Sequence, residues 1–136
     1  MSLDEAREHL DLAMEQWERA CTDAWEPSDA ASCVTNAFYA YENLIVAVAE
    51  AKGSPWKKSH DKKAMLAREL FERKTLSKDL HDEMLRLNTL RKDVSYGEEG
   101  FELRDEDLES LVSELESVLE EVRSIITKLE EEVEDE

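Results

Sequence analysis

The residue with the clearest chemical potential is Arg91, which interrupts the apolar stripe of a helix predicted from about residue 76 or 78 to residue 96. At 100° per residue, Arg91 falls about 20° from Leu80, in the middle of that stripe. A guanidinium keeps its proton and is costly to desolvate, so its five donors need carboxylates, carbonyls, a ligand or a subunit boundary. Two roles stay open: phosphate binding, or a core bridge to a carboxylate such as Asp93 or Glu42.

Polar residues run beside this stripe and along one strip of a second predicted helix. His81, Asn88 and Ser95 lie on one edge of the stripe, which ends at Tyr96. The helix predicted over residues 29–52 is apolar except for a narrow polar strip of its own. We therefore hypothesise a cleft between the two helices, lined by Arg91, Asn88, Ser95, Tyr96, Asn36, Tyr39 and Asn43. The competing interpretation is that these polar residues only specify how subunits pair.

Positive charge is concentrated in one segment of an acidic chain. The formal net charge is −18, yet residues 52–92 hold 12 basic and 6 acidic side chains. A nucleic acid must meet a positive surface, so this segment is where a phosphate-bearing partner would bind. The candidates for phosphate attraction are Lys57, Lys58, Lys62, Lys63 and His60. The alternative is a solvated helix face paired with neighbouring carboxylates.

Other chemistries find little support in the sequence. Cys21 and Cys33 have no metal-ligand spacing and fall at or near apolar helical positions, so we expect two core thiols. Neither a nucleophile triad nor a Gly-rich phosphate loop stands out. We therefore expect no metal and no cofactor.

The pattern of apolar residues predicts an all-α fold. Apolar positions recur at steps of three and four residues, and 136 residues with three glycines and two prolines suit one bundle. The sequence predicts one domain over residues 1–136, with an acidic tail that frays from about residue 130. Its five helices are expected over about residues 3–24, 29–52, 60–73, 76 or 78 to 96, and from 105 onward, in an up-and-down arrangement.

Two further expectations concern surroundings. The longest apolar stretch, residues 44–49, is far short of the ~20 residues that cross a bilayer, and the first residues lack the basic start of a signal peptide. We expect a cytoplasmic protein that does not enter membranes. The helix over residues 29–52 is apolar nearly all round, which is typical of a helix central in a bundle or shared with a partner subunit.

Three segments resemble the HEPN domain family: residues 36–43 (Asn-Ala-Phe-Tyr-Ala-Tyr-Glu-Asn), His60 at the start of the third helix, and residues 87–97 (Leu-Asn-Thr-Leu-Arg-Lys-Asp-Val-Ser-Tyr-Gly). The resemblance covers about residues 4–130 and is most specific at its last segment. It implies a small all-α bundle that forms a homodimer, with the second helix and the end of the fourth near the two-fold axis. It also implies a role beside nucleotidyltransferase-like partners in toxin–antitoxin, defence or RNA-processing systems.

The family's catalytic signature is an arginine, then four to six intervening residues, then a histidine. Arg91 matches the arginine, but Tyr96, Gly97 and Glu98 occupy the positions of the histidine. A phenol with an ordinary pKa near 10 is a poor base at neutral pH. Arg91 and Tyr96 are the only catalytic candidates of that motif, and we expect a non-catalytic protein that binds a nucleotide, RNA or a partner. The alternatives are a metal-independent ribonuclease toxin and a dimeric scaffold for a basic protein.

Overall fold

The all-α prediction is confirmed. The computed structural model describes residues 2–24, 30–95 and 107–134, without the side chains of residues 93–95. Within these ranges the chain forms five helices and no strand. They are α1 (Leu3–Asp23), α2 (Ala30–Lys52), α3 (His60–Glu72), α4 (His81–Ser95) and α6 (Leu108–Glu134).

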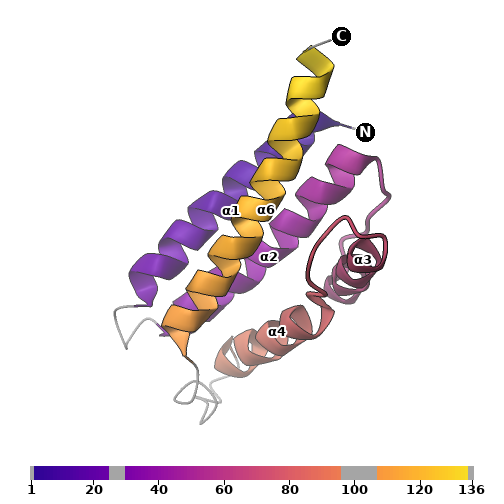
Figure 1. Ribbon diagram of the computed structural model, residues 1–136. Helices are drawn as coiled ribbons and strands as arrows, with labels where there is room; N and C mark the ends of the chain where they lie inside the picture. The colour runs from indigo at the N-terminus through magenta and orange to yellow at the C-terminus, as the bar shows by residue number, and fades with distance from the viewer. Residues whose placement is uncertain (1, 25–29, 96–106, 135–136) are drawn as a thin grey trace.

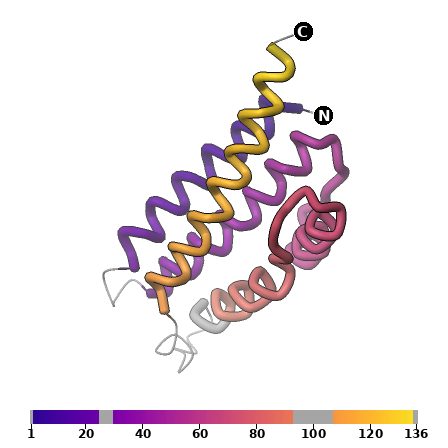
Figure 2. Tube along the Cα trace, viewed as in Figure 1, coloured from indigo at the N-terminus to yellow at the C-terminus, as the bar shows by residue number. Residues whose placement is uncertain are grey.

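Helix α2 is the centre of the bundle. It packs against α1 and α6 on one side and against α3 and α4 on the other, and Figures 1 and 2 show this order. Helices α1, α2 and α6 run side by side, whereas α3 is seen almost along its axis and so crosses their direction. The two ends of the described chain lie at the same end of the bundle (Figure 1).

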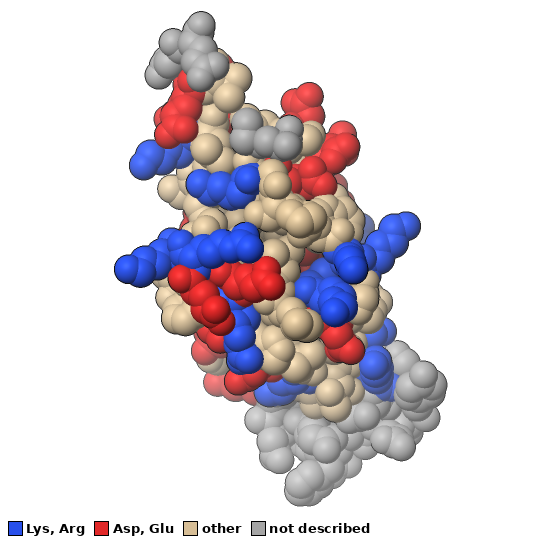
Figure 3. All heavy atoms as spheres, turned by 90° about the vertical axis from the view of Figure 1, so that its right-hand side faces the viewer, with Lys and Arg blue, Asp and Glu red and all other residues tan. Residues whose placement is uncertain are grey.

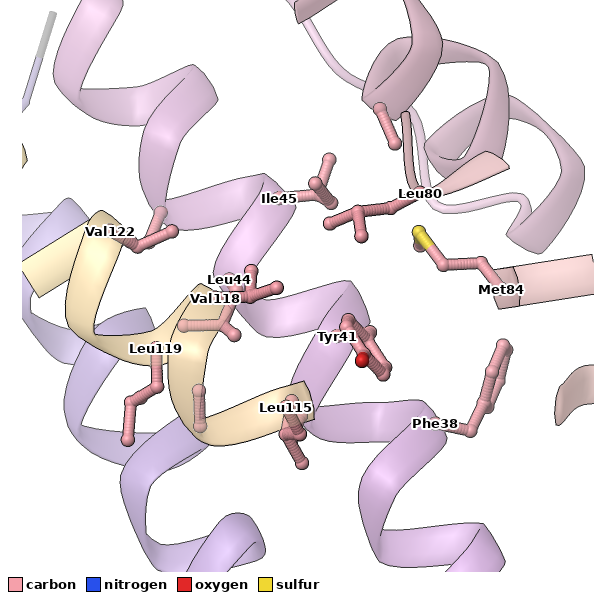
Figure 4. Packing of buried hydrophobic residues seen from close by; sticks show 14 of the residues in the cluster. Phe38, Tyr41, Leu44, Ile45, Leu80, Met84, Leu115, Val118, Leu119 and Val122 are labelled. Carbon is pink, nitrogen blue, oxygen red and sulfur yellow. The ribbon is translucent and has the colours of Figure 1, made fainter. Parts of the chain in front are cut away.

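The burial of α2 explains why its sequence is apolar nearly all round. Phe38, Tyr41, Leu44 and Ile45 are buried on its surface; Figure 4 shows them between side chains of α6 and α4. Burial raises the pKa of the Tyr41 phenol, which stays protonated. Since one chain covers α2 on all sides, its apolar character no longer argues for a subunit boundary there. The homodimer itself stays a prediction.

Helices α1 and α6 close the other side of the core. Buried residues of α6 recur at steps of three and four: Leu111, Leu115, Val118, Leu119, Val122 and Ile126. Trp17 of α1 donates from Nε1 to the backbone carbonyl of Val112, 3.1 Å away. Arg7 forms an ion pair with Glu130. Helix α6 continues to Glu134, beyond the boundary at residue 130 where the sequence predicts the acidic tail.

The helix boundaries agree with the predictions to within one residue except at the starts of α4 and α6; α6 begins at Leu108 rather than near residue 105. Ser59, expected as the cap of α3, accepts a hydrogen bond from the backbone N–H of Lys62. Helix α4 begins at His81 rather than at residue 76 or 78. The intervening residues form a loop fixed by Ser77, whose N–H and hydroxyl both donate to Glu121 of α6 at 3.0 Å. This long-range anchor is absent from any local sequence pattern.

A membrane span is not found among the described residues, where every helix is too short or too polar to cross a bilayer.

Candidate functional site

The pair formed by His60 and Glu42 is the centre of the candidate site. His60 is the first residue of α3, and its Nδ1 lies 2.6 Å from Oε2 of Glu42 on α2. The Glu42 side chain is only 4% exposed, whereas that of His60 is 38% exposed. A buried carboxylate needs hydrogen bonds or opposite charge, and this one has both. The pair joins the core of the bundle to its surface.

Lys63 completes the surroundings of the Glu42 carboxylate. Its Nζ lies 3.7 Å from the second oxygen, Oε1, and its side chain is 16% exposed. The same ammonium lies 5.7 Å from the centroid of the Trp56 ring, within the range of a cation–π contact. Because His60 and Lys63 are one helical turn apart on α3, one carboxylate fixes the start of that helix against α2.

Arg91 reaches the same region from α4. Its guanidinium carbon lies 5.2 Å from the centroid of the Phe38 ring and 5.5 Å from that of Tyr39. One terminal nitrogen donates to Oδ1 of Asn88 at 2.7 Å. The rings and the amide help to hold the guanidinium in place. Glu42, one of the carboxylates considered for Arg91 from the sequence, instead forms a hydrogen bond with His60 and an ion pair with Lys63.

The two aromatic rings bring Arg91 and His60 into one neighbourhood. The His60 ring lies 5.3 Å from the Phe38 ring and 6.5 Å from the Tyr39 ring, measured between centroids. Phe38 is buried, while Tyr39 is partly exposed. The imidazole of α3 and the guanidinium of α4 therefore both pack on the two rings of α2, one of which carries a phenol. This arrangement can bind an anion and contains a group that can transfer a proton.

Two members of the predicted cleft lie elsewhere, against α1. Asn43 donates from Nδ2 to Gln16 at 2.9 Å, and its Oδ1 lies 3.1 Å from Nδ1 of His9. Asn36 donates to Oδ2 of Asp23 at 3.4 Å and to the carbonyl of Ser32 at 3.0 Å. The structure thus divides the polar strip of α2: Tyr39 is with Arg91 and Asn88, whereas Asn36 and Asn43 fasten α1 to α2.

A polar network beside Asn43 fixes the segment between α2 and α3. Trp56 donates from Nε1 to Glu50 at 2.6 Å, and its ring meets the His9 ring edge-on at 6.0 Å. A hydrogen bond with Glu50 raises the pKa of the exposed Glu5 carboxyl. Through Trp56, this network also determines where Lys63 and the start of α3 lie.

The lysines proposed for phosphate attraction lie at the His60 end of α3. Lys57, Lys58 and Lys62 are exposed and, within the described part of the chain, have no ion pair. The arginines of the basic segment differ, since Arg68, Arg73 and Arg86 all pair with carboxylates. Figure 3 shows the resulting surface, on which blue and red side chains are interspersed. The basic segment thus contains lysines without an ion pair near His60 and salt-bridged arginines beyond them, and phosphate attraction by the lysines stays a prediction.

The remaining predicted residues stand apart or lie outside the described region. Ser95 ends α4. Tyr96 lies outside the described residues, so its place in the predicted cleft stays a prediction. His81 pairs with Asp82 at 2.8 Å, at the opposite end of α4 from Arg91. Among the described residues, no three His, Cys, Asp or Glu side chains lie together in a way that could hold a metal ion.

Sequence reasoning considered Glu42 only as a partner for Arg91 and did not identify Phe38 as part of the site. Phe38 and Glu42 are one helical turn apart, so both lie on the same face of α2. In the sequence, the signal for this site is Glu42, a carboxylate on the most apolar helix of the chain. Its partner could not be identified, because His60 approaches from a different helix.

Comparison with protein families gives one match that covers this geometry. A family model described as HEPN domain matches residues 2–125, which include α1 to α4 and most of α6. Comparison with curated proteins and with solved structures gave no match. The family match confirms the resemblance seen at residues 36–43, His60 and residues 87–97 and spans far more than half of the sequence. The chain belongs to the HEPN domain family.

Proposed function

We propose that this chain binds RNA or a nucleotide through its phosphate, at a site formed by Arg91, His60 and Tyr39. The observation that carries this proposal is the position of Arg91, which Asn88 and the two aromatic rings that also contact the His60 imidazole hold in place. Membership of a nucleotide- and RNA-related family supports the choice of ligand. A phosphate would accept from the guanidinium, and Tyr39 offers a partly exposed ring for a base to stack on.

The unpaired lysines extend the proposed site. Lys57, Lys58 and Lys62 surround the start of α3, where His60 also lies. In a chain with a net charge of −18, long-range attraction of a polyanion is unfavourable, so binding depends on a local positive surface. These lysines provide it. We therefore expect an oligonucleotide with several phosphates to bind more tightly than a mononucleotide.

The test is fluorescence anisotropy with a labelled single-stranded RNA at 50 mM salt. Arg91→Ala should weaken binding by about 10-fold or more, since it removes a charge-assisted hydrogen-bond donor. The matched control is Arg86→Ala, because Arg86 is on the same helix and pairs with Glu83 on the exposed side. Equal affinities of both variants, or the absence of RNA and nucleotide binding by the wild type, would contradict the proposal. If the wild type binds neither RNA nor nucleotides, the dimeric scaffold for a basic protein becomes the favoured function.

A further inference from the structure

The hydrogen bond between His60 and Glu42 determines which nitrogen of the imidazole carries a proton. An ionised carboxylate only accepts, so Nδ1 must donate to Oε2 over the 2.6 Å between them. In the neutral ring, Nε2 then holds the lone pair. Nε2 lies on the other edge of the ring from the buried carboxylate, and this side chain is 38% exposed. His60 is therefore arranged as a base that accepts a proton from outside the core.

A second histidine–carboxylate pair, His81 with Asp82, differs from the pair of His60 and Glu42 in how firmly its carboxylate is held. His81 lies 2.8 Å from Asp82, but the Asp82 side chain is 88% exposed and adjacent in sequence. Water competes for such a pair and leaves its geometry loosely fixed. Glu42 is instead buried, comes from a different helix and is balanced by Lys63. Among the described residues, only His60 has an orienting carboxylate whose position the core determines.

His60 also packs on the same aromatic ring as Arg91, the cation that would bind a phosphate. The guanidinium of Arg91 and the imidazole of His60 both lie a little over 5 Å from the Phe38 ring, at 5.2 and 5.3 Å. His81 is ten residues before Arg91 on one helix, roughly 15 Å along its axis. Of these two histidines, His60 is thus the one that packs on the same rings as Arg91. The family motif alone does not identify His60, because the motif histidine follows the arginine in sequence whereas His60 precedes it.

We propose that His60 is a catalytic base, positioned by Glu42, that allows this chain to cleave RNA without the motif histidine and without a metal. Nε2 takes the proton of a ribose 2′-hydroxyl while its oxygen forms a bond to the adjacent phosphorus. Arg91 stabilises the charge on the non-bridging oxygens. The bond from phosphorus to the 5′-oxygen breaks, and that oxygen takes a proton from water, while the imidazolium returns its proton to solvent. The products are a 2′,3′-cyclic phosphate and a 5′-hydroxyl.

This inference rests on the proposed function, since RNA must bind at Arg91 before His60 can act. The experiment therefore measures binding and cleavage separately, with the full chain, a single-stranded RNA labelled at its 5′ end, and EDTA throughout. Wild type is expected to produce cyclic-phosphate ends and to leave the matching DNA, which lacks the 2′-hydroxyl, intact. His60→Gln should lower the single-turnover rate at saturating protein by about 100-fold or more, a loss that weaker binding cannot cause once all the RNA is bound. The matched control, His81→Gln, should cleave normally.

Glu42→Gln tests the positioning role. It should lower the rate by about 10-fold or more and move the acidic limb of the pH–rate profile to lower pH, because an amide stabilises an imidazolium less than a carboxylate does. The charged or titratable groups around His60 in the structure are Glu42 and Tyr39 of α2, Lys63 of α3 and, across the rings, Arg91 of α4. A mere loss of folding would reduce the rate without moving the profile. If Glu42→Gln does not fold, His60→Gln, at a partly exposed position, decides the matter.

The outcomes separate the two proposals. Binding without cleavage by the wild type would overturn the catalytic inference and leave the binding proposal standing. Cleavage that persists in His60→Gln would overturn the role of His60. Failure to bind RNA or nucleotides would contradict the proposed function itself, and the catalytic inference with it.

Discussion

Arg68 and Asp79 close the connection between α3 and α4 with a hydrogen bond of 2.9 Å from Nε to Oδ2. The other carboxylate oxygen of Asp79 accepts the backbone N–H of His81 at 3.0 Å, where α4 begins. Asp79 thus links Arg68 of α3 to the first residue of α4. Since α4 carries Arg91, this carboxylate helps to determine where the guanidinium lies.

We expect Asp79→Ala to lower the free energy of unfolding at pH 7 by about 1 kcal/mol, the usual effect of removing a helix-capping side chain. The hydrogen bond from the His81 backbone, and then Arg68, lower the pKa of Asp79. Its contribution is therefore present above the ordinary carboxyl pKa and disappears as the pH falls through the lowered value. Urea denaturation should show a difference from wild type that is large at pH 7 and small near pH 3. An equal difference at both values would contradict this.

Glu5→Gln should raise the melting temperature at pH 7. The hydrogen bond with Glu50 raises the pKa of Glu5, so the folded chain holds this proton more tightly than the unfolded chain. That contribution is present at low pH and is lost as the pH rises through the raised pKa, where two carboxylates repel each other. Glutamine donates to Glu50 at every pH. The gain should vanish near pH 4, and Glu15→Gln, at another exposed position of α1, should show none.

The double variant Lys57→Ala/Lys58→Ala should bind RNA more weakly and with less dependence on salt. Each lysine that neutralises a phosphate of a single strand contributes about 0.7 to the slope of log Kd against log salt, so the slope should fall by about 1.4. A titration from 50 to 200 mM salt measures it. Lys78→Ala is the control, because Lys78 is in the basic segment but lies beyond the far end of α3. An unchanged slope would show that the two lysines do not contact phosphate.

The homodimer can be tested by light scattering at micromolar concentration. The family resemblance predicts a particle of twice the 15.7 kDa mass of the chain. Because α2 is covered within one chain, we expect any contact between subunits to involve the end of α4 rather than α2. Arg91→Ala would then change the dimerisation constant, whereas Arg86→Ala would not. A mass of 15.7 kDa would contradict the prediction.

The sequence predicts the helices well because their signals are local. Apolar spacing locates α1, α2 and α6, and the side chain of Ser59 caps α3 as expected. It predicts the start of α4 less well, since Ser77 is held by a residue of α6 that is 44 positions away. The same reason limits the site. Arg91 stands out from its own helix, but the partner of His60 is decided by how α3 packs on α2.

The position of α2 has a consequence for how the candidate site opens. Glu42 and Phe38 lie on the helix that every other described helix covers, so their amide hydrogens should exchange with solvent only when the whole bundle unfolds. His60 lies on α3, which packs mainly on α2 and α4 and crosses the direction of the main helices. Local opening of α3 would separate the imidazole from its carboxylate while the rest of the bundle stays folded. A ligand that contacts both His60 and Arg91 would suppress this opening, and slower amide exchange in residues 60–72 would report that it is bound.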